Sequence, residues 1–99
     1  MYGNREGYWE TYYYDGELEL TGTYVNGEEQ GIFNFFHDNG VLWCKGLYVN
    51  GNKQGIWEYY DEDGRLESKG RYKDGDREGV WEYYENDIIV NKEDYGGVC

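Results

Sequence analysis

The sequence lacks the features that mark secreted and membrane proteins. It has no proline, and its two cysteines, Cys44 and Cys99, are too few for a disulfide framework. No apolar run approaches the ~20 residues that a membrane-spanning helix needs. After Met1 there is no basic segment followed by an apolar one, as a secretion signal would require. We therefore expect a soluble, cytoplasmic protein.

Positive charge is also scarce. The chain has 9 Lys and Arg against 21 Asp and Glu, which gives a net charge of -12 at pH 7. Such a polyanion repels the phosphates of nucleic acids and anionic membranes, so we expect neither as a direct partner. It would instead steer a basic protein toward itself. The same charge would also keep an aromatic-rich sheet soluble, and composition alone leaves both interpretations open.

Aromatic side chains and glycine are abundant instead. Phe, Trp and Tyr make up 20% of the chain and there are 16 glycines, whereas long aliphatic residues are sparse. Large rings can cover a sheet face without a second layer of helices. No stretch shows a helical period with caps. The 99 residues suit one domain with a modest core.

The clearest signal is an internal repeat with a period of 24 residues. The unit reads Y-x-x-G-x-x-x-G-x-W-x-Y-Y-x-x-x-G-x-L-x-x-x-G-x. Its columns include Tyr24, Tyr48 and Tyr72; Gly31, Gly55 and Gly79; Phe33, Trp57 and Trp81; and Gly22, Gly46 and Gly70. We expect units at about 1–23, 24–47, 48–71 and 72–90, followed by a tail over 91–99.

Each unit has the pattern of a β-hairpin, so the predicted fold class is all-β. In one copy, strands over 56–60 and 65–72 flank a turn over 61–64, and a second loop over 74–79 joins the units. Gly75 and Gly79 are expected to adopt backbone conformations closed to other residues.

Alternation along the strands assigns two faces. Leu66, Gly70 and Tyr72 share an apolar face with Trp57, and the residues between them form a charged, wet face. The strand glycines leave room for a ring from the neighbouring strand to lie across them. Cys44 falls on the apolar face as a small core residue.

Copy two and the two ends depart from the pattern. In copy two the wet face has apolar residues in place of charges: Val41, Trp43, Leu47 and Val49. They indicate either local packing or a contact patch. We expect the first strand, 8–13, at a sheet edge, where a partner strand could pair and form a homodimer. The apolar run 88–90 is expected to cap the stack, with a loose tail over 96–99.

The repeated residues resemble the MORN-repeat superfamily, and most closely the MORN-variant repeats of bacterial YwqK-type antitoxins. The resemblance rests on the segment 48–60, followed by Gly64-Arg65-Leu66, and on the same columns in the other copies over about 3–86. It implies an elongated, twisted, antiparallel β-meander. It also implies functions as an immunity protein that neutralises a toxin, or as a scaffold.

A possible metal site and a possible catalytic residue carry little weight. The segment 74–79, with Glu85 after it, nearly matches the calcium loop of an EF-hand. The repeat explains its glycines more simply, because segments 26–31 and 50–55 share the shape without flanking helices. His37, the only histidine, is expected to lie in water at a turn and cannot form a catalytic triad alone. We expect no metal, no cofactor and no enzymatic activity.

Three functions remain as hypotheses. The first is an antitoxin or immunity-type inhibitor that blocks a basic protein, such as a nuclease or another nucleic-acid-binding protein. The second is a phage-type counter-defence inhibitor that imitates the charge of nucleic acid, and the third is a scaffold without inhibitory activity. The candidate partner-binding residues are Asp61, Glu62, Asp63, Asp74, Asp76, Glu78 and Trp43.

Overall fold

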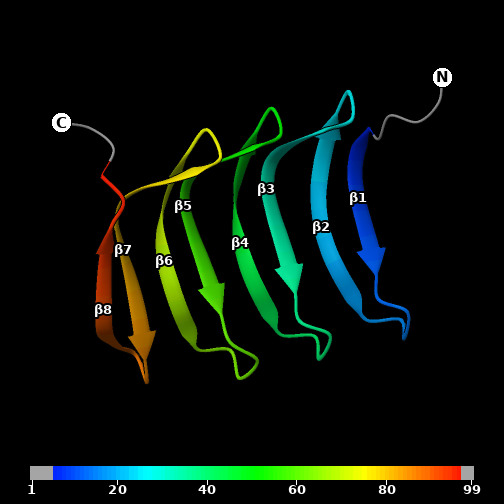
Figure 1. Ribbon diagram of the computed structural model, residues 1–99. Coiled ribbons are helices and arrows are strands. Elements are labelled where there is room, and N and C mark those ends of the chain that lie inside the picture. Colours follow the sequence, from blue (N-terminus) through cyan, green and yellow to red (C-terminus); the bar gives the residue numbers. More distant parts are fainter. Residues whose placement is uncertain (1–5, 97–99) are drawn as a thin grey trace.

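The computed structural model describes residues 6–96 as one antiparallel sheet of eight strands, each paired with its neighbours in sequence (Figure 1). The strands are β1 (Gly7–Tyr12), β2 (Leu18–Val25), β3 (Glu28–Phe36), β4 (Leu42–Val49), β5 (Asn52–Tyr60), β6 (Leu66–Lys73), β7 (Asp76–Glu85) and β8 (Ile88–Asp94). Within residues 6–96 there is no helix. The predicted all-β meander of hairpin repeats is confirmed.

Two kinds of turn alternate along the chain, one at each end of the strands (Figure 1). The turns that join β2 to β3, β4 to β5 and β6 to β7 contain two residues each. Asn50 and Gly51, for example, have φ angles of 50° and 83°. Two consecutive positive φ angles match the twist of the flanking strands, and Asn-Gly adopts them at low cost. The loop expected over 74–79 is therefore wrong, since Asp74-Gly75 completes the turn and β7 begins at Asp76.

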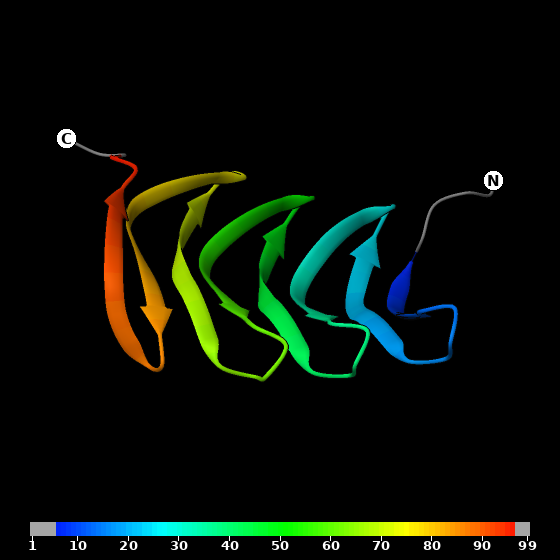
Figure 2. The same ribbon diagram turned by 60° about the horizontal axis from the view of Figure 1, so that its bottom comes forward.

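A bulge follows each two-residue turn. Gly55 has a φ angle of 71° inside β5, and the register between β4 and β5 shifts there. Gly31 and Gly79 occupy the same place in β3 and β7. Such bulges bend the strand, and the sheet in Figure 2 is accordingly curved rather than flat.

The core is a row of rings on one side of the sheet, the aromatic face. Trp57 is 0% exposed, and its ring lies across Gly46 of the preceding strand. A Cβ atom built on Gly46 would come within 2.1 Å of this ring. The same joint recurs between Gly22 and Phe33 and between Gly70 and Trp81. The prediction that strand glycines make room for neighbouring rings is confirmed.

Tyrosines fill the spaces between these rings. The rings of Tyr48 and Trp57 meet edge to face, with centroids 5.2 Å apart at 87°, and Tyr72 contacts Trp81 at 5.1 Å and 81°. Contacts of this geometry contribute about 0.5–1.5 kcal/mol each beyond the area they bury. The Trp57 indole Nε1 also donates a hydrogen bond of 3.1 Å to the Leu47 carbonyl. Each ring therefore ties its own hairpin to the preceding one.

The last hairpin is more complete than expected. Its turn, Asn86-Asp87, is shorter than the corresponding turns in the other hairpins, and β8 then pairs with β7 as far as Asp94. Tyr95 contacts Trp81 edge to face at 6.4 Å and 83°, as Tyr72 contacts Trp57 at 6.0 Å and 83°. The unit boundary expected at residue 90 therefore falls inside β8. Residues 97–99 of the expected tail, with Cys99, lie outside the described residues.

The apolar run 88–90 does not cover the stack. Ile88, Ile89 and Val90 are exposed at the start of the outer strand β8. The expectation that they pack as a cap is wrong, because the strand that would lie over them on the apolar side is not part of residues 6–96.

Candidate functional site

The side of the sheet away from the buried rings, the opposite face, is not uniformly wet. Ile32, Ile56 and Val80 are each more than half exposed there and stand 24 residues apart. Sequence analysis missed this row, although its signal is plain: each residue directly precedes the ring column. Ile32, Leu47 and Ile56 line a shallow hollow of about 360 Å³. The face therefore combines exposed aliphatic groups with charges in every repeat.

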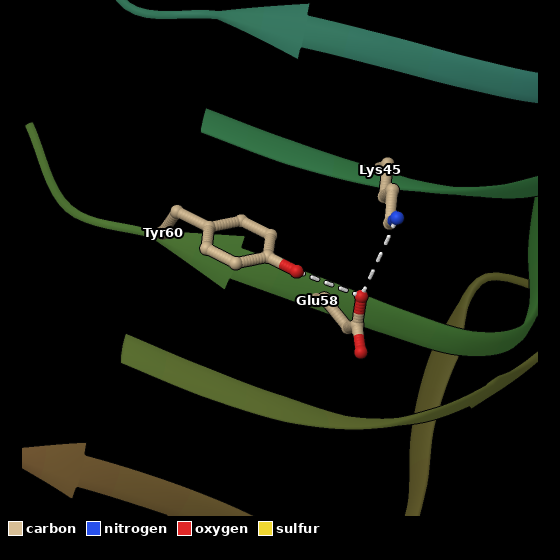
Figure 3. Close-up of polar contacts among 3 residues, drawn as sticks. All are labelled: Lys45, Glu58 and Tyr60. Atoms are coloured by element: carbon tan, nitrogen blue, oxygen red, sulfur yellow. Dashed lines mark hydrogen bonds and ion pairs between the residues drawn. The ribbon is translucent and has the colours of Figure 1, made fainter. Parts of the chain in front are cut away.

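The charges on this face form local pairs. Figure 3 shows the Glu58 carboxylate between Lys45 and Tyr60. The Tyr60 hydroxyl donates a hydrogen bond of 2.9 Å to Glu58 Oε1, and Lys45 Nζ lies 3.9 Å from the same oxygen. Burial, and after it the hydrogen bond to Glu58, raises the pKa of Tyr60. The hydroxyl therefore stays protonated at neutral pH.

Most of the net charge collects at one end of the strands. We define the long-turn rim as residues 13–17, 37–41, 61–65 and 85–88, which Figure 1 shows along a single edge. The rim has eight acidic residues and one basic residue, Arg65, and thus a net charge of −7 out of −12. The acidic residues are Asp15, Glu17, Asp38, Asp61, Glu62, Asp63, Glu85 and Asp87.

Two aromatic side chains stand at the same rim. Tyr14 is fully exposed at 105%, and Trp43, which begins two residues after the turn 37–41, is 45% exposed. Trp43 packs against His37 with ring centroids 5.5 Å apart. His37 is half-buried, and its Nε2 lies 2.8 Å from the carbonyl oxygen of Tyr60 in the next repeat. The expectation of a solvated histidine is corrected: the ring links two long turns.

The candidate partner-binding residues separate into two groups. Asp61, Glu62, Asp63 and Trp43 lie at the long-turn rim, whereas Asp74, Asp76 and Glu78 lie at the other end of the strands. One contact surface at the rim therefore excludes the second group.

Asp61 has a structural task within the first group. Its Oδ1 accepts the backbone N–H groups of Asp63 at 2.9 Å and Arg65 at 3.0 Å. These hydrogen bonds, that from Arg65 foremost, lower the pKa of Asp61. Glu62 and Asp63 are exposed, and their carboxylates are the rim charges best placed for a partner.

The segment that resembles a calcium loop is a turn followed by a strand. Asp74 Oδ1 accepts a hydrogen bond of 2.7 Å from Gln54 Nε2. Glu85 lies at the far end of the ten-residue strand β7, about 30 Å from Asp76 at the rise of an extended chain. Ligands so far apart do not surround one ion. No cluster of three or more His, Cys, Asp or Glu side chains suited to a metal occurs within residues 6–96.

The aromatic face has its own shallow hollow. It measures about 250 Å³ and lies over Cys44, with Phe35, Tyr59 and Lys53 in its wall. Cys44 is buried, as predicted, and burial raises the pKa of its thiol to about 11. The thiol is therefore protonated at neutral pH and a poor nucleophile. Lys53 Nζ lies 4.8 Å above the Trp57 ring, a cation–π contact that holds the cation against the sheet.

These features define a single-layer β-hairpin repeat protein. The family described as MORN repeat variant matches residues 5–26, 29–50 and 53–74, about two thirds of the chain. The chain belongs to this family. Each matched segment ends at the first residue of a two-residue turn, so the family unit is one hairpin with its long turn. No curated protein matches the chain significantly.

The described strands leave no candidate for a membrane-spanning helix, because residues 6–96 contain no helix long and apolar enough.

Proposed function

We propose that this chain is a protein-binding domain that acts as an inhibitor of the antitoxin or immunity type. The partner is a basic protein, and it docks at the long-turn rim. The observation that supports this proposal most is the concentration of charge: the rim has a net charge of −7, and the exposed rings of Tyr14 and Trp43 stand beside it.

The physical argument combines attraction with anchoring. Exposed carboxylates spread along one edge attract a basic surface over a distance of about 10 Å at physiological salt and speed its approach. Exposed aromatic side chains then supply contacts that charges alone do not, since tryptophan and tyrosine are common among the residues that dominate interface energies. The rim offers both within a few residues of each other.

A nuclease or another nucleic-acid-binding protein fits the rim by charge, because its own site attracts phosphates. An anionic edge would occupy such a site and exclude the nucleic acid. A phage-type counter-defence inhibitor uses the same attraction against a different target, so the identity of the partner distinguishes the two. We propose that the domain works in the cytoplasm and that it catalyses no reaction itself.

A scaffold without inhibitory activity is the second candidate. The row of exposed aliphatic residues Ile32, Ile56 and Val80 favours it, because a surface repeated in every hairpin suits an extended apolar partner. Binding at this face would be resistant to salt, whereas binding at the rim would not.

Charge reversal at the two ends of the strands tests the proposal. The variant Glu62→Lys/Asp63→Lys alters the rim and leaves Asp61 to hold the turn. The control variant Glu28→Lys/Asp76→Lys makes the same charge change at exposed positions of the other end.

Tagged full-length chains are used to capture partners from host lysate at low and high salt. We expect the unaltered chain and the control to retain a basic partner at low salt, and the rim variant to lose it. Purified partner should lose activity when the unaltered chain is added. Equal capture by both variants, or an active partner in the complex, would contradict the inhibitor proposal.

A further inference from the structure

The two outer strands, β1 and β8, differ at the position that joins neighbouring hairpins. Inside the sheet, β2, β4 and β6 each present a glycine, and the ring of the next hairpin lies across it at Gly22, Gly46 and Gly70. A Cβ atom at any of these positions would approach the ring within 2.1–2.2 Å. Glycine at this column is therefore required wherever another hairpin packs.

β8 has Glu93 at the glycine column. Glu93 pairs with Trp81 across β7 and β8 as Gly70 pairs with Trp57 across β5 and β6. Its carboxylate accepts hydrogen bonds from the hydroxyls of Tyr95 at 2.7 Å and Tyr83 at 2.9 Å. The Glu93 side chain thus occupies the place that the ring of a further hairpin would need, and the β8 edge is closed to this joint.

β1 presents the other half of the joint. Trp9 is half-buried, whereas its equivalents Phe33, Trp57 and Trp81 are at most 1% exposed. Its indole Nε1 donates to the Glu6 carbonyl at 3.0 Å, whereas the Trp57 indole donates to a carbonyl of the preceding strand. Within residues 6–96, β2 is the only strand that pairs with β1. Its outer edge therefore offers a tryptophan with the geometry of an interior ring.

We propose that the outer edge of β1 docks an extended segment of a partner protein that has glycine opposite Trp9 and an aromatic residue two positions later. The chain itself shows this occupant three times, for example as Gly46 and Tyr48 of β4 against Trp57 of β5. The segment runs antiparallel to β1, and a basic residue before its glycine faces Glu10 as Lys45 faces Glu58. Glu93 prevents the chain from supplying such a strand to a second copy of itself.

This inference goes beyond the proposed function, since it concerns an edge away from the long-turn rim and depends on the fit of backbone and ring. Binding at the β1 edge should survive high salt and the rim variant Glu62→Lys/Asp63→Lys. Failure of the rim proposal therefore leaves this one intact, and the reverse also holds.

A peptide measures the docking directly. The probe is the labelled segment 42–49 with Cys44→Ser, titrated with the full-length chain and followed by fluorescence anisotropy. We expect saturable binding, and a loss of about tenfold or more in affinity for Trp9→Ala, because a central tryptophan is removed. The matched peptide with Gly46→Val should not bind. Equal binding of the two peptides, or no effect of Trp9→Ala, would overturn the proposal.

The closed edge is tested by opening it. Glu93→Gly and Glu93→Ala both remove the carboxylate, and they differ by one methyl group at the place where a ring must lie. We expect Glu93→Gly to form concentration-dependent, head-to-tail oligomers in sedimentation velocity, and Glu93→Ala and Glu93→Gly/Trp9→Ala to stay monomeric. Identical behaviour of the glycine and alanine variants, both folded by circular dichroism, would contradict the role of Glu93. If Glu93→Gly does not fold, the peptide titration decides alone.

Discussion

Ile56 and Trp57 are neighbours in β5, yet they lie on two faces with different tasks. Trp57 is 0% exposed and lies against a glycine of the next strand, whereas Ile56 is 54% exposed beside charged groups. A single-layer sheet has no second layer to bury its rings, so the aromatic face must bury them by close joints between strands. Stability therefore depends on the aromatic face, and the opposite face and the rim are free to serve binding.

The largest effect is expected from filling a strand glycine. Gly46→Val places side-chain atoms where the Trp57 ring now lies, since even a Cβ atom would approach it within 2.1 Å. The backbone and the ring cannot both keep their places, and the total stability of a small domain is only about 5–15 kcal/mol. We expect loss of the cooperative thermal transition in circular dichroism. The control Leu47→Val, one residue along on the opposite face, should keep it.

Removal of the ring is the next largest change. Trp57→Ala should lower the free energy of unfolding by about 3–5 kcal/mol, because it deletes a fully buried aromatic side chain. Urea unfolding followed by far-ultraviolet circular dichroism measures the loss. A variant as stable as the unaltered chain would show that the aromatic face is not the core.

Asp61 at the long-turn rim should give an intermediate effect. Asp61→Ala removes the acceptor of two backbone N–H groups and should lower Tm, though by less than Trp57→Ala. The pKa of Asp61 is lower in the folded chain, so its contribution is present above the unfolded pKa of about 3.9 and is lost as pH falls through the folded value. The gap in Tm between the two chains should therefore narrow below about pH 4. A gap that widens in acid would refute this explanation.

The smallest effect is expected on the opposite face. Ile56→Ser changes a side chain that is 54% exposed and should alter the free energy of unfolding by at most about 0.5 kcal/mol. The urea midpoint of this variant, compared with that of Trp57→Ala, measures the difference between the two faces at adjacent positions. A large loss of stability in Ile56→Ser would mean that the two faces share the core.

The sequence predicted the parts of the fold that repeat without insertion. The period, the two faces and the strand glycines follow from columns such as Gly46 and Gly70, whose spacing is constant. The fourth hairpin was missed because its turn is one residue shorter: Tyr95 follows Tyr72 by 23 residues instead of 24, and the gapless pattern ends there.

The remaining errors have local causes. The bulge at Gly79 appeared to be part of a loop, because a glycine with a positive φ angle is common in both. The long-turn rim could not be recognised as one acidic edge, since its carboxylates are spread over the sequence and meet only when the strands align. The role of His37 depends on Tyr60, a residue of the next hairpin, and no local pattern indicates that contact.

The central claim is that a ring from one hairpin packs directly against a glycine of the preceding one. A double-mutant cycle between residues 46 and 57, measured by urea unfolding, tests it most directly. Gly46→Ala should strongly destabilise the unaltered chain and cost little in a Trp57→Leu background, with a coupling free energy of at least about 1 kcal/mol. Equal costs of Gly46→Ala in both backgrounds would show that ring and glycine do not depend on each other, and would contradict the account.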